Sequence, residues 1–441
     1  MSEEKNEQEE EIREATHSDL FEINLDQFLE ELSALNDTLP TQLSLLSFRH
    51  KTLIEKLEKI STTTEEKDED GEEFIRYKLN SEHSDEFLKI HKHLSRTDIA
   101  RKILPRNYIV SIISQYDAFL GNLVKTLYEI NPNIIRSSEK ELNVEDLFNY
   151  ESIDELKEHI VDKEVDSLLR EEHYEQFNIL EKRISIVTGK DFTLTTNLPV
   201  LPKFIELTQR RNLFVHTNGQ TTRQYFESKR KWKFNSECSG ELNEELKADG
   251  KYCDEAFEVL YEISVKLTHV LWRKFVPQER EQADEHLNQV IYDLLNDNNY
   301  NLVIIIANFA TDIIKTFSSE QLRKFIIINK AIAFKLLGKE KECKNVLKKE
   351  DWSIGNEFKL AKLVLEENYE EAGKLMIKIG TNDELVNQKA YKKWPLFKLF
   401  RKTDQFKASY LELYNEEFAL EELQSKKDLE KDKEIETEEN K

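Results

Sequence analysis

The sequence contains little glycine and proline, with 10 and 7 of these residues in a chain of 441. Because most tight turns need one or the other, their scarcity argues against a sheet of many short strands and favours long helices. Charged residues make up 34% of the chain and hydrophobic residues 39%, proportions typical of amphipathic helices. We therefore expect an all-α fold, and the length allows two or three domains.

Long apolar runs are also missing, since none reaches the roughly 20 residues that span a bilayer. The segment from Met1 to Glu14 is acidic, which suits neither a secretory signal nor an arginine-rich transit peptide. Only three cysteines occur, far apart and without a CxxC pair: Cys238, Cys253 and Cys343. They indicate neither a disulfide framework nor a zinc knuckle. These absences predict a cytoplasmic protein with no membrane association.

Positive charge is scarce overall, because the net charge is −23. This excludes a broad basic surface that coats polyanions, but it does not exclude one local basic site. No P-loop or Rossmann glycine motif occurs, so a nucleotide cofactor is not expected. His91 and His93 diverge by about 200° on a helix and have no cysteine nearby. We therefore expect no metal and no cofactor.

Composition divides the chain into five segments. Residues 1–19 and 424–441 are charged and poor in aromatic residues, so we expect both to be disordered. Residues 20–103 are predicted to form a helical hairpin that breaks at Pro40, followed by an acidic loop from Ser61 to Glu73. Residues 104–277 and 278–423 are predicted to form two further helical regions.

Residues 104–277 are predicted to contain five helices. The first begins at Pro105, and the second opens with a capping box at Ser152. The third ends near Gly189. The fourth, KFIELTQRRNLFVH, ends at Asn218 and Gly219, which signal a left-handed cap. The fifth covers about residues 252–275.

The sequence pattern of residues 278–423 is typical of short paired helices. The segment NKAIAFKLLGKEKEC, with Ala331 and Gly338, is echoed about 30 residues later by FKLAKLVLEENYEEAGKL, with Ala361 and Asn368. A fainter echo lies at Asn299. Such a period is typical of stacked helix–turn–helix repeats, and it resembles a degenerate tetratricopeptide-type (TPR-like) array.

The fourth helix carries the residues that suit chemistry. On a helical wheel, Phe204 and its apolar neighbours define one buried face, which includes Val215, and Arg211 falls inside that face. Arg210 and Leu213 fall on the outer side. Asn212 and His216 lie one turn apart on the flank. Arginine grips phosphate and histidine exchanges protons near neutral pH, so this set suits phosphodiester chemistry without a metal.

Positive charge gathers around this helix. From residue 203 to residue 233 the sequence has eight basic residues and two acidic ones, a balance of 8 − 2 = +6. The candidate RNA contacts here are Arg210, Arg223, Lys229, Arg230, Lys231, Trp232 and Lys233. Aromatic residues interleave with these charges, as stacking on unpaired bases would require: Tyr225, Phe226, Trp232 and Phe234.

The alternative reading is that Arg211 and His216 are five residues apart by chance. The asparagine directly after the arginine, the position at a helix end and the basic aromatic surroundings all favour a functional site. The segment RRNLFVHTNG resembles the signature of HEPN-domain proteins (higher eukaryotes and prokaryotes nucleotide-binding). The helix SIISQYDAFLGNLVKTLYEINP, the segment SIDELKEHIVDKEVDSLLRE and the helix EVLYEISVKLTHVLWRKFVP extend the similarity over residues 104–277.

This resemblance implies a metal-independent endoribonuclease. His216 would be the general acid or base, Arg211 would hold the scissile phosphate, and Asn212 would orient either of them. Asp117, in the first helix of the domain, either pairs with Arg211 or is a surface carboxylate. Attack by a ribose 2′-hydroxyl would leave a 2′,3′-cyclic phosphate.

The resemblance also implies partners. HEPN ribonucleases place two motifs opposite each other in a homodimer, and the family includes toxins and antiviral defence proteins. Single-stranded RNA is the expected substrate, and the TPR-like region offers a surface for a protein partner. The alternative is a catalytically inactive scaffold or regulator of the same fold.

Overall fold

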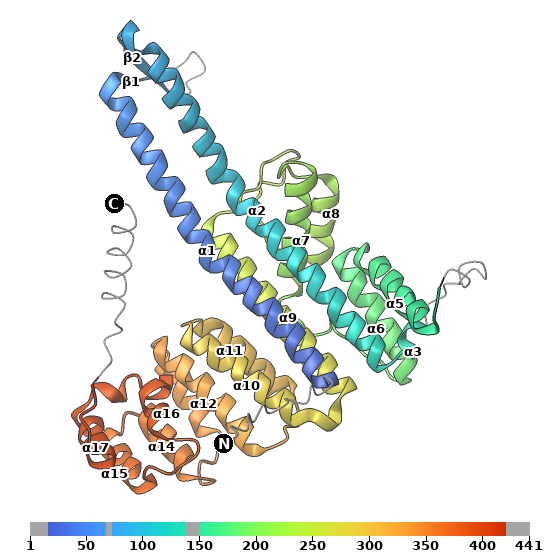
Figure 1. Ribbon diagram of the computed structural model, residues 1–441, viewed down its shortest axis with the longest axis vertical. Coiled ribbons are helices and arrows are strands. Elements are labelled where there is room, and N and C mark those ends of the chain that lie inside the picture. Colours follow the sequence, from blue (N-terminus) through green and yellow to red (C-terminus); the bar gives the residue numbers. More distant parts are fainter. Residues whose placement is uncertain (1–15, 68–72, 137–149, 420–441) are drawn as a thin grey trace, which may run out of the picture. The chain divides into compact units, whose positions relative to one another are not determined.

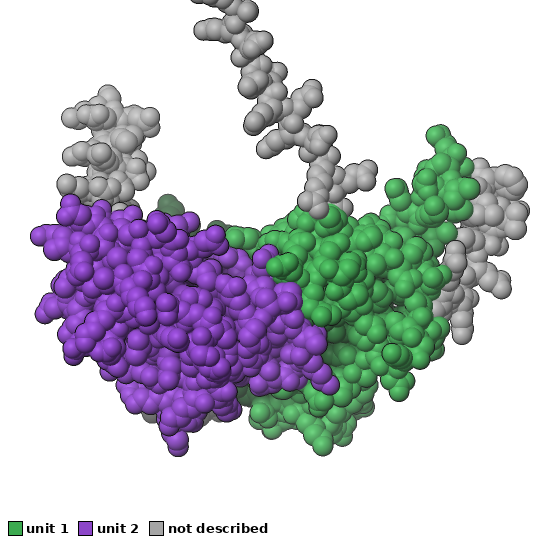
Figure 2. All heavy atoms as spheres, turned by 90° about the horizontal axis from the view of Figure 1, so that it is seen from below, with its two compact units in different colours: residues 1–283 green, residues 284–441 purple. Residues whose placement is uncertain are grey.

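The computed structural model describes residues 16–67, 73–136 and 150–419 (Figure 1). The chain divides into two compact units, residues 1–283 and residues 284–441, which Figure 2 shows in different colours. The mostly helical character is confirmed, with one small β-hairpin in the described ranges. The predicted disordered segments lie outside these ranges, except that residues 17–19 open the first helix and Thr16 caps it.

Unit 1 is organised by two long helices, α1 (His17–Ile60) and α2 (Ser84–Ile130), which lie side by side in Figure 1. The predicted break at Pro40 and the predicted helix start at Pro105 are both wrong, because α1 continues through Pro40 and α2 continues through Pro105. Buried residues lie on both sides of each proline, so packing between the helices outweighs the hydrogen bond that each proline removes. The predicted segment boundary at residues 103 and 104 lies within α2.

A β-hairpin replaces much of the predicted acidic loop. Strand β1 (Ser61–Lys67) pairs antiparallel with β2 (Glu73–Leu79), and Ser61 opposes Leu79. Three consecutive β-branched threonines at the start of β1 favour the strand. A short 3₁₀ turn, η1 (Ser81–His83), then leads into α2.

The remaining helices of unit 1 pack against α1, against α2 or against one another. They are α3 (Asn133–Arg136), α5 (Ile153–Leu169), α6 (His173–Thr188), α7 (Leu201–His216), α8 (Arg223–Trp232) and α9 (Gly250–Phe275), followed by the 3₁₀ turn η2 (Pro277–Glu279). The Ser152 side chain caps α5 by accepting from the Glu155 amide, and Gly189 ends α6 with φ +63°. Helix α9 packs against both α1 and α2, and this contact builds the main core.

Unit 2 is built from short helices. They are α10 (Arg280–Asn296), which begins in unit 1, α11 (Tyr300–Asn308), α12 (Glu320–Leu336), α13 (Glu340–Lys348), α14 (Asn356–Leu365), α15 (Tyr369–Ile379), α16 (Gln388–Lys393) and α17 (Asp404–Tyr414). A π turn, η3 (Phe309–Ile313), follows α11, and two 3₁₀ turns, η4 (Pro395–Phe397) and η5 (Phe400–Lys402), precede α17.

Three helix pairs in unit 2 share one type of turn. A residue with positive φ ends α10, α12 and α14, namely Asn298, Gly338 and Glu367. In each case the next amide reaches back to a carbonyl five residues earlier, over 2.8, 2.9 and 2.9 Å. This is the Schellman hydrogen bond of a tight helix end. The repeated motif in the sequence therefore corresponds to a repeated helix cap.

Candidate active site

Helix α7 carries the Arg-Asn…His motif, and its end is held firmly. Asn218, with φ +54°, follows the helix and receives two 3.2 Å hydrogen bonds from Nη1 of Arg106 on α2. Gly219 has φ +84°, and a Cβ there would lie 3.3 Å from the Leu246 carbonyl and from the Phe214 ring. Only glycine suits this position. The cap predicted at these residues therefore fixes where the last turn of α7 lies.

The side chain of Arg211, on α7, reaches Asp117 on α2. Its Nη2 is 3.8 Å from Oδ2 of Asp117, and its Nη1 donates to Oδ1 of Asn212 over 3.1 Å. The Arg211 and Asp117 side chains are 25% and 27% exposed, so both are reachable from solvent. Asp117 thus pairs with Arg211 rather than standing alone on the surface. Three of the four predicted catalytic residues lie together.

A second histidine, His173, completes this group and was not predicted. It opens α6, and its Nε2 lies 2.8 Å from Oδ1 of Asp117. Its ring packs against the rings of Tyr116 and Phe204, with centroid distances of 6.1 and 5.5 Å. Asp117 therefore holds His173 with one oxygen and faces Arg211 with the other. No motif in the sequence links residues 117 and 173, so sequence spacing offers no signal for this pair.

The interior side of the group is buried. The Tyr116 ring is fully buried, and burial, followed by the charge of Asp117, raises its pKa well above the usual value. Nε of Arg211 is also buried, and it has no hydrogen-bond partner among the described residues. A buried guanidinium donor without an acceptor is unfavourable. This donor is closed to solvent, so a ligand would meet the exposed part of the Arg211 side chain, which is 25% exposed as a whole.

His216 lies on the last turn of α7, and its side chain is exposed. It makes no hydrogen bond or ion pair with any residue that the structure describes, so it is not joined to Arg211 within the chain. The neighbouring Val215 is 48% exposed, although the wheel placed it on the buried face. His216, the fourth predicted catalytic residue, thus lies exposed at the C-terminal end of α7.

Arg210 was predicted to lie on the outer side of α7 and to contact RNA, but it is buried, with 3% of the residue exposed. Its Nε donates to Glu206 over 2.7 Å, its Nη1 donates to the Lys247 carbonyl over 2.9 Å, and its guanidinium lies 3.9 Å from the centre of the Tyr252 ring. Leu213, also predicted to face outward, is 5% exposed. The wheel failed because α7 packs against α2 on one side and against α8 and α9 on others, so it has more than one buried face.

Glu206 is the centre of this buried network. Besides Arg210, it accepts hydrogen bonds from the hydroxyls of Tyr225 and Tyr252, over 2.9 and 2.8 Å. Burial, together with the charge of Glu206, raises the pKa of both tyrosines. Burial acts to lower the pKa of Arg210, but its interactions with Tyr252, Glu206 and Tyr225 raise that pKa overall. The network stays protonated on the tyrosines and is structural.

The remaining basic residues lie on and after α8, where the side chains of Arg223, Arg230, Lys231 and Lys233 are exposed. Lys229 is half-buried and donates to Oγ of Ser236 over 3.0 Å. The ring of Trp232, also half-buried, lies 3.9 Å from the ring of Tyr174, centre to centre. Tyr174 directly follows His173, so the last turn of α8 packs against the residue next to His173.

Two aromatic residues of this segment do not offer stacking surfaces. Tyr225 and Phe234 are 1% and 4% exposed. Their rings pack 5.6 Å apart inside unit 1. Of the interleaved aromatics, only Phe226 and Trp232 keep partly exposed rings.

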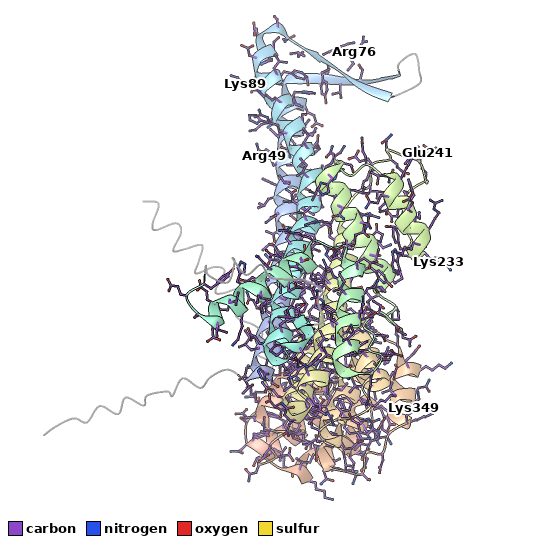
Figure 3. All side chains as sticks on the ribbon, turned by 90° about the vertical axis from the view of Figure 1, so that its right-hand side faces the viewer. Arg49, Arg76, Lys89, Lys233, Glu241 and Lys349 are labelled. Carbon is purple, nitrogen blue, oxygen red and sulfur yellow. The ribbon has the colours of Figure 1, made fainter. Side chains whose placement is uncertain are left out.

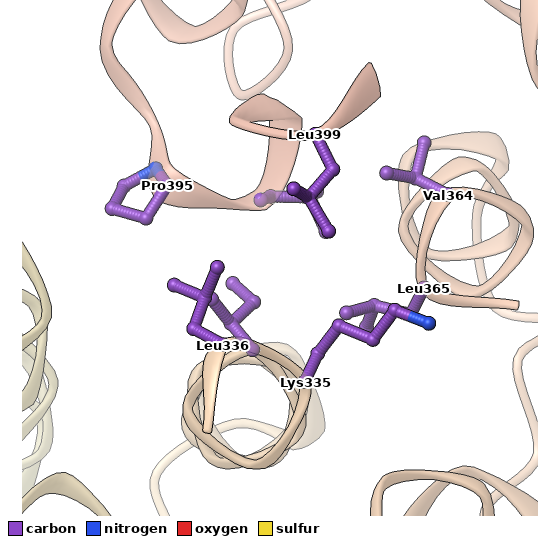
Figure 4. Close-up of a pocket in the computed structure, with 8 residues that line it drawn as sticks. Lys335, Leu336, Val364, Leu365, Pro395 and Leu399 are labelled. Carbon is purple, nitrogen blue, oxygen red and sulfur yellow. The ribbon is translucent and has the colours of Figure 1, made fainter. Parts of the chain in front are cut away.

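We also searched the described residues for a metal site, a membrane-spanning helix and a pocket. Across the described ranges, no three His, Cys, Asp or Glu side chains gather closely enough to hold a metal ion. None of the helices in those ranges combines the length and the apolar character that a membrane span needs. Unit 2 has an apolar pocket between α12, α14 and η4, shown in Figure 4. Its one cation, Lys335, is paired with Glu340 and Glu367.

Comparison of the chain with protein-family models, with curated proteins and with solved structures finds no match. The HEPN resemblance therefore rests on the motif and helices quoted from the sequence. The geometry adds the contacts between Asp117, Arg211, Asn212 and His173.

Proposed function

We propose that this protein is a metal-independent endoribonuclease of HEPN type that cuts single-stranded RNA in the cytoplasm. The observation that carries the proposal is the placement of Arg211, whose side chain is 25% exposed, beside Asp117, Asn212 and His173. A guanidinium that is oriented by a carboxylate and is partly open to solvent is suited to bind a phosphate oxygen. The proposed role of Arg211 is to neutralise charge on the scissile phosphate.

The proposed reaction moves two protons and exchanges one P–O bond for another. The ribose 2′-oxygen bonds to phosphorus, and the bond from phosphorus to the 5′-oxygen breaks. The 2′-hydroxyl gives its proton to a base, and the departing oxygen takes a proton from an acid. The products are a 2′,3′-cyclic phosphate and a 5′-hydroxyl, and no water is consumed. His216 is the proposed proton-transfer group, because imidazole serves as either acid or base near neutral pH.

The exposed cations of α8 are the proposed contacts for the RNA strand. Arg223, Arg230, Lys231 and Lys233 are open to solvent, and Trp232 offers part of its ring. Their position beside Tyr174, next to His173, would bring a bound strand to Arg211. Arg210 is left out of this set because Glu206 and Tyr252 enclose it.

We further propose that the active form is a homodimer. One exposed imidazole supplies one proton transfer, whereas the reaction benefits from a base and an acid together. A two-fold axis beside His216 would bring the second imidazole from another copy. The exposed Val215 next to it supports an interface at this end of α7.

The experiment is cleavage of labelled single-stranded RNA by the purified full chain in the presence of EDTA. We expect the wild-type chain to cut and to leave cyclic phosphate ends, and His216→Ala to lower the rate by at least about a hundredfold. His93→Ala, which removes another exposed histidine of unit 1, is the matched control and should cut normally. Loss of activity with EDTA that magnesium restores would refute the metal-independent mechanism.

The second candidate function is an inactive scaffold or regulator of the same fold. It is favoured by the lack of any bond between His216 and Arg211 within the described residues. The repeated helix caps of unit 2 fit a TPR-like array that binds a protein partner. A wild-type chain that binds RNA or protein but never cuts RNA, at any enzyme concentration, would favour this candidate.

A further inference from the structure

One part of unit 1 has no role in the proposed site. We call it the arm, and it consists of residues 41–60 of α1, the β-hairpin, and residues 84–104 of α2. Figures 1 and 3 show the two helices continuing past α7 and α8 to the hairpin. Inside the arm, Leu57, Ile90 and Leu94 form a small apolar cluster. These residues lie where the two helices face each other, and the opposite side of α2 is exposed.

That outer side of α2 is both basic and apolar. With 100° per residue, its cations and large apolar residues all fall within about 80° of the direction of Ile99. We call this set the α2 stripe: Leu88, Lys89, Lys92, Arg96, Ile99, Lys102 and Ile103. All seven side chains are exposed, and Figure 3 labels Lys89 near the hairpin end. The stripe from Lys89 to Lys102 is about 20 Å long.

The four cations of the stripe are unpaired. None of them forms an ion pair with a residue that the structure describes, whereas Arg101, on another side of α2, lies 3.8 Å from Asp98. Asp85 is the one carboxylate in the same sector, so the local balance is 4 − 1 = +3 in a chain of net charge −23. Unpaired, exposed cations held along one line create a local positive potential that attracts an anionic ligand.

The stripe runs in line with the proposed active site. Arg106, seven residues after Ile99, lies on the same side of α2 and bonds to Asn218 at the end of α7. Asp117, eleven residues further, lies on that side too and faces Arg211. An extended ligand on the stripe would therefore reach the end of α7, where His216 is exposed.

We propose that the α2 stripe binds the sugar-phosphate backbone of the RNA strand whose cut site lies at Arg211. This inference rests on the proposed function and adds a second contact region to it. The cations match phosphates, and the interleaved Leu88, Ile99 and Ile103 match the apolar faces of bases or riboses. The stripe lacks the paired donors and acceptors that read base edges, so the contact is independent of sequence.

The test compares two full-length variants with the same change of net charge. The stripe variant carries Lys92→Glu, Arg96→Glu and Lys102→Glu. The control carries Arg49→Glu, Lys51→Glu and Lys56→Glu on the α1 side of the arm, where these residues are exposed. Circular dichroism and thermal unfolding establish that both variants are folded.

Binding is measured with a single-stranded RNA of about 25 nucleotides as a function of salt. We expect the stripe variant to bind at least about tenfold more weakly and the slope of log affinity against log salt to fall by about 2, since each lost phosphate contact on a single strand removes about 0.7. The control should lose less than about threefold. Equal losses in both variants, or no loss in either, would overturn the proposal.

Cleavage separates this inference from the proposed function. The stripe variant should cut an RNA of about 6 nucleotides as well as the wild-type chain does, and it should show a raised KM with unchanged kcat on the RNA of about 25 nucleotides. If the wild-type chain cuts neither RNA, the proposed function fails. The binding measurement would still show whether the α2 stripe binds RNA. A lower kcat on the short RNA would place the stripe residues in the active site and contradict their assignment as a remote contact.

Discussion

At the scale of single residues, Arg210 and Arg211 are neighbours that bind different groups. Arg210 is enclosed by Glu206 and Tyr252, whereas Arg211 lies in a partly exposed pair with Asp117. We expect Arg211→Lys to reduce RNA cleavage at least about tenfold and to change the free energy of unfolding by less than about 0.5 kcal/mol, because its ion pair is partly solvated.

Arg210→Lys should have the opposite profile. It leaves a charge near Glu206 but loses the Nε hydrogen bond and the stacking on Tyr252, so we expect a loss of about 1–3 kcal/mol of stability. Cleavage at a temperature where the variant is folded should stay near the wild-type rate. Denaturant unfolding and cleavage assays on both variants check this, and a stable but inactive Arg210→Lys would contradict the assignment.

His173 acts through Asp117 and is a positioning residue in the proposed mechanism. We expect His173→Ala to lower kcat about tenfold with little change in KM, because Asp117 would lose the partner that orients it toward Arg211. His173→Gln should recover much of the rate, because its amide donates a hydrogen bond as the imidazole does.

A double-mutant cycle with Asp117→Ala is the control for this role. In the Asp117→Ala background, the change at His173 should have almost no further effect on kcat. Fully additive losses from the two substitutions would show that His173 contributes by a separate route.

The sequence led to part of this residue group and not to the rest. Arg211 and Asp117 could be predicted because Arg211 lies within an apolar stripe and Asp117 at the edge of one, where a charged side chain needs a partner. The orientation of Arg210 could not be predicted from the sequence, because α7 is covered by α2 and also by α8 and α9. His173 was missed because it meets Asp117 only when α6 packs beside α2.

At the scale of elements, the long helix α1 contains a proline at an exposed position, Pro40. A proline inside a helix costs up to about 3 kcal/mol, and its stiffness in the unfolded chain returns about 0.4–1 kcal/mol. We therefore expect Pro40→Ala to raise the free energy of unfolding by about 1–2 kcal/mol. Denaturant unfolding of the full chain measures this.

Pro277 is the matched control for that substitution. It is also exposed, but it stands at the start of η2, where its missing amide would have no helical partner. Pro277→Ala should leave the stability unchanged or lower it slightly. A destabilised Pro40→Ala variant would show that Pro40 itself is needed for the native path of α1 beside α2.

Helix ends were predicted better than helix breaks. The cap at Ser152, the left-handed end at Gly189 and the turn at Asn218 and Gly219 all depend on side chains or backbone angles within a few residues. Continuity through Pro40 and Pro105 depends on buried contacts between two helices, which no local pattern contains. The β-hairpin joins those helices where only an acidic loop was expected.

At the scale of the whole molecule, the dimer proposed for the active form can be tested at the exposed end of α7. Val215 is 48% exposed beside His216, so Val215→Asp should break an interface there without disturbing the core. We expect the wild-type chain to sediment as a dimer and Val215→Asp to sediment as a monomer with at least about tenfold less cleavage.

Ile186→Asp on α6 is the control for a change of one exposed apolar residue to a charge, because Ile186 is 56% exposed on another helix. It should leave both mass and activity unchanged. A monomeric wild-type chain that cuts RNA at full rate would refute the composite site. A fragment that begins near residue 100 would not serve here, since it removes α1, whose apolar side chains pack in the core with α2 and α9.

The sequence by itself determined the helical class, the local caps, the repeated turns of unit 2 and the presence of a basic segment around α7. These follow from composition, periodicity and the conformations open to a few neighbouring residues, which are local properties. Only the tertiary structure decided which arginine is enclosed, that His173 meets Asp117, and that α1 and α2 run on as an arm with an unpaired basic stripe. Each of these depends on which surfaces pack against a helix, and packing is set by residues far away in the chain.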